Sequence, residues 1–252
     1  MDDAGLERVR AHLGTVLATM SARIGALADA GPDWWLGLTG GVSADLNMAF
    51  LATSDPDTLA GTVAIVEEAG LDALVMLAGP GRELSPRLTA PWVGVGTSPI
   101  MTRDLTTGGA DALDPRVRQA GAADAGVLAA LIAEAFALPV DDAALMAAAA
   151  VTGGVVRAWL LEEGGEVVSA VVTGHLDDGV SLWAMSTPSR LARRGFGRTL
   201  LASVLAHARA DGATLGMLGA TPAGLPLYEA TGWRTVEEWE VFTNAESAQF
   251  SH

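Results

Sequence analysis

The chain of 252 residues contains no cysteine, no lysine and a single tyrosine, Tyr228. The absence of cysteine excludes disulfides, thiolate nucleophiles and cysteine metal sites, and it is compatible with a reducing compartment. All 15 basic residues are therefore arginines, and 30 acidic residues bring the formal net charge at neutral pH to −15. This excess of carboxylates disfavours nucleic acids and anionic membrane surfaces as partners, because both repel negative charge.

Uninterrupted apolar segments long enough to span a membrane are also missing, since charges or glycines break every candidate. The first residues of the chain are acidic and do not resemble a secretory signal. The apolar content of 50% is nevertheless ample for the core of one large domain or of two ordinary ones. We therefore expect a globular protein with a cytoplasmic location.

A segment of small, polar and turn-forming residues at 106–115 separates two regions with regular apolar patterns. This composition is typical of a linker. We therefore predict one domain over 1–105, a linker over 106–115 and a second domain over 116–243.

The second region is predicted to have the element order β, α, α, β, β, β, α, β, α, β. Apolar runs bounded by glycine-containing turns predict antiparallel strands at 155–161, 167–173 and 180–186. Between 197 and 210 the apolar residues recur at helical spacing. The remaining predicted elements are a strand at 117–120, helices at 122–136 and 141–151, a strand at 214–218, a helix at 225–231 and a strand at 235–242.

The first region resembles a reduced copy of the second. Trp92 and Trp233 lie 141 positions apart, and the same offset pairs Leu59 with Leu200 and Met76 with Met217. The copy differs before its helix, where the short segment 53–57 contains neither glycine nor arginine.

Four arginines lie within nine positions where the strand at 180–186 is joined to the helix at 197–210, together with Gly195 and Gly197. A glycine-bearing loop at a helix N-terminus presents unpaired backbone N–H groups, so it can hold a phosphate or pyrophosphate. The two glycines would allow a close approach to the backbone. The alternative is a tight turn surrounded by solvated arginines. The four arginines of this loop and helix start are Arg190, Arg193, Arg194 and Arg198.

Two motifs in this region resemble those of the GNAT superfamily of acyl-CoA-dependent N-acyltransferases. The first family signature, (Gln or Arg)-x-x-Gly-x-(Gly or Ala), is matched by Gly195 and Gly197, but Ala192 stands at its leading position. In the second, Tyr228 on a short helix precedes the Gly232-Trp233 pair by four residues. The resemblance covers about residues 116–243. It implies an α/β protein with a tandem GNAT-like fold, in which each half has a mixed central sheet flanked by helices.

The resemblance also implies acetyl-CoA as co-substrate and a loop that holds its pyrophosphate mainly through main-chain amides. In the family, the residue that matches Tyr228 protonates the departing CoA thiolate, and a phenol can do so because it stays protonated at neutral pH. The alternative for Tyr228 is a packed aromatic with no chemical role. The implied cofactor-binding residues are Met185, Ser186, Thr187, Arg193, Arg194, Gly195, Phe196, Gly197 and Arg198.

The general base is not evident from the sequence. His175, at the end of a predicted strand, is the candidate, although a histidine in this position is more often a surface or packed residue. The carboxylates of Glu162 and Asp177 lie in or near turns and are weaker candidates. None of the other histidines has the spacing of a metal ligand, so we expect no metal site.

These observations predict an N-acetyltransferase that transfers acetyl from acetyl-CoA to a primary amine of a small molecule by direct attack. Two alternatives stay open: a non-catalytic acyl-CoA-binding protein with a regulatory or partner-binding role, motivated by Ala192, and acylation of protein amines. Arg87 stands at the offset of Tyr228 in the first half. We therefore expect that half to bind no CoA, and instead to close the acceptor cleft or form the surface of a homodimer.

Overall fold

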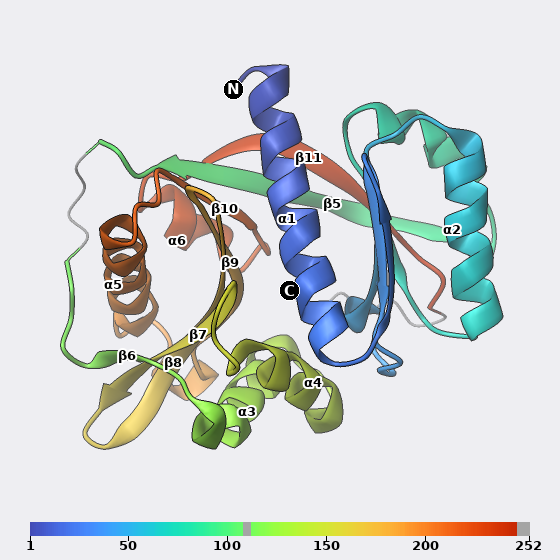
Figure 1. The fold of residues 1–252 in the computed structure, drawn as a ribbon. Helices are drawn as coiled ribbons and strands as arrows, with labels where there is room; N and C mark the ends of the chain where they lie inside the picture. Colours follow the sequence, from blue (N-terminus) through green and yellow to red (C-terminus); the bar gives the residue numbers. More distant parts are fainter. Residues whose placement is uncertain (108–111, 246–252) are drawn as a thin grey trace. The chain divides into compact units, whose positions relative to one another are not determined.

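The computed structural model describes residues 1–107 and 112–245 (Figure 1). The chain divides into two compact units. Unit 1 contains Met1–Ile100 and Thr235–His252, and unit 2 contains Met101–Arg234. The middle of the predicted linker, 108–111, lies outside the described residues. Within the described part of the chain, no helix is both long and apolar enough to cross a membrane.

Unit 1 is built on a mixed sheet with the strand order β1-β2-β3-β4-β11. Strands β3 and β4 are parallel, and the other neighbours pair antiparallel. In chain order its elements are α1 (Asp3–Arg23), β1 (Leu27–Gly31), β2 (Trp34–Leu38), the short 3-10 helix η1 (Ala44–Leu46), β3 (Asn47–Leu51), α2 (Pro56–Ala69), β4 (Leu74–Leu77), the 3-10 helix η2 (Gly79–Arg87), the first part of β5 (Val93–Asp104), and β11 (Arg234–Thr243).

Helix α2 has clear start and stop signals in its sequence. Its N-cap Asp55 accepts hydrogen bonds from the backbone N–H groups of Asp57 and Thr58, and Pro56 occupies the first turn, where no N–H is needed. Gly70 ends the helix in the left-handed conformation at φ 64°. The buried face of α2 packs Leu59 and Val66 into the core of the unit.

In unit 2 the strands follow the order β10-β9-β8-β7-β6. Strands β9 and β10 are parallel, and the others are antiparallel. From β6 to β11 the order of elements along the chain is the one that the sequence predicts, although the last strand, β11, belongs to unit 1. The elements are β6 (Val117–Gln119), the 3-10 turn η3 (Ala122–Asp124), α3 (Ala125–Phe136), α4 (Val140–Ala150), β7 (Val156–Glu163), β8 (Glu166–Leu176), β9 (Gly179–Ser186), the 3-10 turn η4 (Ser189–Leu191), α5 (Phe196–Ala210), β10 (Leu215–Gly219) and α6 (Leu225–Glu229).

Both units contain the same strand–helix–strand arrangement. In unit 1, α2 connects the parallel pair β3 and β4, and in unit 2, α5 connects the parallel pair β9 and β10. An offset of 141 residues carries the start of β4 at Leu74 onto the start of β10 at Leu215. The predicted α/β class, with a mixed sheet flanked by helices, is confirmed.

Strand β11 and the end of β5 belong to different units from those that the predicted domain boundaries imply. Strand β11 follows the second region in sequence but belongs to unit 1, where it pairs antiparallel with β4. The carboxylate of Glu237 on β11 accepts hydrogen bonds from Arg10 of α1 and from the backbone N–H of Gly79. Conversely, Met101 and Leu105 pack into the core of unit 2. That 1–105 and 116–243 fold as separate domains stays a prediction.

Candidate active site

The end of strand β9 leaves backbone groups outside the ladder with β10. The parallel pairing runs from Gly179–Leu215 to Leu182–Leu218, whereas β9 continues to Ser186. The register with β8 shifts between Ala170 and Val172, and Ala184 has a positive φ of 47°, which together mark a β-bulge. An extended ligand could therefore pair with β9 beyond Leu182.

Helix α5 begins at Phe196 without a side-chain cap. Its N-cap, Gly195, is left-handed at φ 87°, and a Cβ built on it would meet no atom within 4 Å. The first amides of a helix have no intrahelical partner, and the positive end of the helix dipole lies behind them. This end of α5 therefore has the features of an anion-binding site.

The start of α5 at Gly197 lies close to the end of β9. A Cβ at this position would be 3.5 Å from Met185 Cε and 3.6 Å from Thr187 Oγ1. The side chain of Phe196 is buried in the core, so only its backbone can face the loop. The structure thus brings together the end of β9 and the glycine loop.

Positive charge gathers beside this helix terminus. Arg193, Arg194 and Arg198 are exposed, and within the described residues none of them forms an ion pair. The guanidinium of Arg194 lies over the ring of Phe196, 5.0 Å from its centroid. Arg190, in contrast, is paired with Glu166. Three guanidinium groups without carboxylate partners, in a chain of charge −15, make this loop a local positive site.

Tyr228 on α6 is only 7% exposed, and its hydroxyl donates to Met185 Sδ at 3.7 Å. Gly224 makes room for the ring, because a Cβ there would lie 2.9 Å from Tyr228 Cε2. Burial raises the pKa of Tyr228 to about 12. The phenol, which is protonated at neutral pH even at its ordinary pKa, thus stays protonated to higher pH while its hydroxyl lies at the end of β9.

Hydrogen bonds of the Ser186 and Thr187 side chains stabilise the end of strand β9. Ser186 Oγ donates to the carbonyl of Ala184 at 2.9 Å, and Thr187 Oγ1 lies 2.8 Å from Ser169 Oγ. Ser169 on β8 also donates to the carbonyl of Ser186. Sequence reasoning missed Ser169, because a small residue in a buried strand gives no pattern that marks it.

His175 is not brought to Tyr228. It pairs with Val180 on β9, and the strand rises roughly 16 Å from Val180 to Met185 at about 3.3 Å per residue. Its Nε2 lies 2.9 Å from Thr173 Oγ1, which also accepts a hydrogen bond from Trp159 Nε1. This placement separates the imidazole of His175, the candidate general base, from the hydroxyl of Tyr228.

The distance leads to a prediction for His175→Gln. Loss of a direct general base lowers the reaction rate about a hundredfold or more. For His175→Gln, in contrast, we expect turnover to stay within about threefold of wild type, with an unchanged pH profile. His207→Gln is the matched control, because that imidazole stacks on Trp159 in the same unit. Steady-state rates from pH 6 to 10 provide the measurement. A hundredfold loss confined to His175→Gln would instead place this imidazole in the proton path.

No metal centre is found in the described part of the chain, where no three histidine or acidic side chains are grouped to hold an ion.

Comparison with known proteins identifies the family. Residues 120–246 match the family model described as an acetyltransferase (GNAT) domain, which is half of the chain. The chain therefore belongs to the GNAT acetyltransferases, as the two motifs indicate. It is an acetyltransferase, and no curated protein matches its sequence.

Solved structures show the same fold over nearly the whole length. A GCN5-related N-acetyltransferase from Kribbella flavida is 14% identical with a TM-score of 0.69, covering 96% of this chain and 97% of its own. A GNAT-family protein from Novosphingobium aromaticivorans is 16% identical with a TM-score of 0.62, covering 94% and 97%. A GCN5-related N-acetyltransferase from Sphaerobacter thermophilus is 12% identical with a TM-score of 0.55, covering 92% and 91%.

Proposed function

We propose that the protein transfers the acetyl group of acetyl-CoA to a primary amine of a small molecule, with Tyr228 as the general acid. The observation that carries the proposal is the buried hydroxyl of Tyr228, protonated at neutral pH and held 3.7 Å from Met185 Sδ. This hydroxyl lies where β9 leaves its ladder with β10. The co-substrate supplies an activated thioester, and the protein's own groups supply position and a proton.

The residues fit such a co-substrate. The amides of Gly195, Phe196, Gly197 and Arg198 would bind the pyrophosphate, with Arg193 and Arg194 adding charge. The backbone of Met185, Ser186 and Thr187 would pair with the amide groups of the pantetheine arm. No metal is needed for either contact.

The proposed reaction is a direct displacement. The neutral amine attacks the thioester carbonyl, a C–N bond forms, and the C–S bond breaks. Tyr228 gives its proton to the sulfur, the nitrogen releases one proton to solvent, and the tyrosinate recovers a proton from water. The net charge of −15 favours the approach of cationic amines. We place acceptor specificity around Phe136–Met146, on α3 and α4 of unit 2.

Unit 1 lacks the features that would let it bind a second co-substrate. Only residues 52–55 separate β3 from α2, and the carboxylate of Asp55 already accepts from the amides of Asp57 and Thr58. A carboxylate therefore occupies the helix terminus that, in unit 2, is uncapped. Arg87 stands in place of Tyr228.

We therefore expect calorimetric titration with acetyl-CoA to give one binding site per chain. The reason is that, among the helices of residues 1–107 and 112–245, only α5 combines an uncapped terminus with unpaired arginines, whereas α2 is capped by Asp55. Two sites per chain would contradict the assignment of unit 1. Absence of binding at millimolar acetyl-CoA would contradict the proposed function itself.

A further inference from the structure

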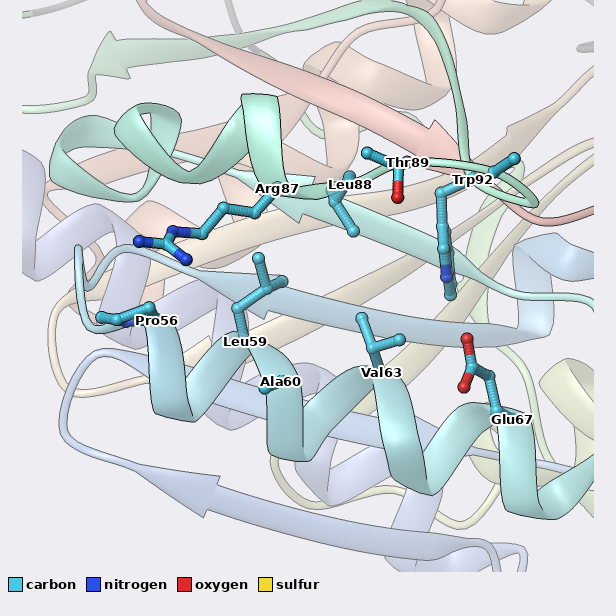
Figure 2. Close-up of a pocket in the computed structure, with 10 residues that line it drawn as sticks. Pro56, Leu59, Ala60, Val63, Glu67, Arg87, Leu88, Thr89 and Trp92 are labelled. Carbon is cyan, nitrogen blue, oxygen red and sulfur yellow. The ribbon is translucent and has the colours of Figure 1, made fainter.

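Unit 1 contains a pocket of about 290 Å³ between helix α2 and the segment that follows η2 (Figure 2). It lies outside the proposed active site, all of whose residues are in unit 2. Apolar side chains form most of its wall, with one charged residue from each side. The lining residues are Pro56, Leu59, Ala60, Val63, Glu67, Arg87, Leu88, Thr89, Ala90 and Trp92.

Comparison with the matching positions of unit 2 shows why unit 1 has this pocket. At the offset of 141 residues, Ala60, Glu67 and Arg87 correspond to Leu201, Ala208 and Tyr228. In unit 2 these three counterparts are all buried in the core. In unit 1 their replacements are exposed, so a small residue and two charged residues stand where unit 2 has closely packed apolar ones. The space between α2 and the segment that follows η2 is therefore open in unit 1, whereas side chains fill the matching space in unit 2.

Opposite charges stand at the two ends of the pocket. The side chain of Arg87 extends toward Pro56 at the start of α2, while the carboxylate of Glu67 lies at the other end, near Trp92 (Figure 2). Within the described residues, neither side chain forms an ion pair. The helix rises roughly 16 Å from Pro56 to Glu67, at about 1.5 Å per residue. This spacing is too long for the two side chains to neutralise each other directly.

Trp92 adds an unsatisfied donor to the wall. The residue is 5% exposed, and its indole Nε1 has no hydrogen-bond partner among the described residues. Figure 2 shows the ring directed from its loop toward α2, above the carboxylate of Glu67. The matching Trp233 also has an unpaired Nε1, but it lies in the closed core of unit 2. A buried donor that lines an open pocket can be satisfied by a ligand.

We propose that this pocket of unit 1 binds an elongated small molecule with an apolar body, an anionic group at one end and a cationic amine at the other. The anion pairs with Arg87, and the amine pairs with Glu67. The apolar body lies against Leu59, Val63 and Trp92 and covers the surface that Ala60 leaves open. The site lies outside the acetyl-transfer machinery and does not depend on the proposed function.

The test uses ω-aminoundecanoate as the probe and measures its affinity for the full-length protein by ligand-observed NMR, without acetyl-CoA. Undecanoate and undecylamine are the comparison probes, because each keeps the apolar chain and only one charge. A pair of part-exposed opposite charges strengthens binding up to about fivefold. We therefore expect the zwitterion to bind more tightly than either singly charged probe, by up to about fivefold. Equal affinity of the three probes would overturn the proposal.

Three variants locate the binding. Ala60→Leu restores the side chain found in unit 2 and should abolish binding of ω-aminoundecanoate, whereas Ala64→Leu, on the same helix outside the lining, should not. Arg87→Gln should remove the advantage of the zwitterion over undecylamine. Glu67→Gln should remove its advantage over undecanoate. Binding unchanged by Ala60→Leu would place the probe elsewhere and overturn the assignment. Acetyl-CoA titration of the same variants, expected to match wild type, separates this result from the proposed function.

Discussion

Replacing Tyr228 with phenylalanine is expected to lower kcat by about 100-fold to 1000-fold and to leave the affinity for acetyl-CoA within about twofold. The substitution removes only the hydroxyl that lies 3.7 Å from Met185 Sδ, and it keeps the ring that packs against Trp233. A positioned general acid contributes about this much to a rate. Steady-state kinetics and calorimetry of the two proteins give the two numbers.

The pH dependence follows from the burial of the same residue. Because the pKa of Tyr228 is raised to about 12, the acid stays protonated from neutral pH to about pH 10. Turnover should therefore rise with pH as the amine acceptor loses its proton, with no falling limb below about pH 10. A descending limb near neutral pH would assign the acid to another group.

The Tyr228→Phe result also separates the two functional classes. An enzyme loses turnover and keeps binding, whereas a non-catalytic acyl-CoA-binding protein shows no turnover in the wild type. Ala192, at the position where the family signature has Gln or Arg, is the residue that motivates the second class. Unchanged turnover in the variant would leave Tyr228 as a packed aromatic.

Gly195→Val is expected to weaken acetyl-CoA binding at least about 100-fold. The new side chain would project into the space beside the first amides of α5, where a Cβ meets no protein atom within 4 Å. Charge-assisted hydrogen bonds to such amides contribute about 1.5–3 kcal/mol each, so losing one or two of them accounts for this factor. Calorimetric titration of the variant provides the measurement.

Gly212→Val is a matched control for this variant. Gly212 follows the other end of α5, also has a positive φ, at 98°, and also has open space around its Cβ position. Both variants should lose about 1–2 kcal/mol of stability from the left-handed backbone. Only the change at Gly195 should affect binding. Equal loss of affinity in the two variants would attribute the effect to destabilisation rather than to the loop.

The elements with strong local signals were predictable from sequence. The turns between β7, β8 and β9 are marked by glycine pairs or acidic-glycine runs, and α5 by its apolar spacing, so the order of unit 2 followed from pattern alone. The candidate role of Tyr228 came from the resemblance of two motifs to a family, and its contact with Met185 became evident only in the structure. Helix α1 and the hairpin β1–β2 were not predicted, because α1 has a weak amphipathic pattern and β1 is mostly exposed.

Other features depend on contacts between residues far apart in sequence. The bulge at Ala184 and the support of Thr187 by Ser169 arise from the pairing of β8 with β9, which no local pattern reports. The same register separates His175 from Met185. The pocket beside α2 became visible only when its exposed lining could be compared with the buried counterparts in unit 2.

The position of β11 has a consequence for synthesis of the chain. Unit 1 is a discontinuous body: its last strand emerges from the ribosome only after all of unit 2, and the carboxylate of Glu237 that joins Arg10 to Gly79 emerges with it. Unit 2 is complete earlier, at Arg234. Domains that fold during synthesis generally do so from the N-terminus onward, but here the N-terminal sheet must wait, with an open edge at β4, until the whole of unit 2 has been translated.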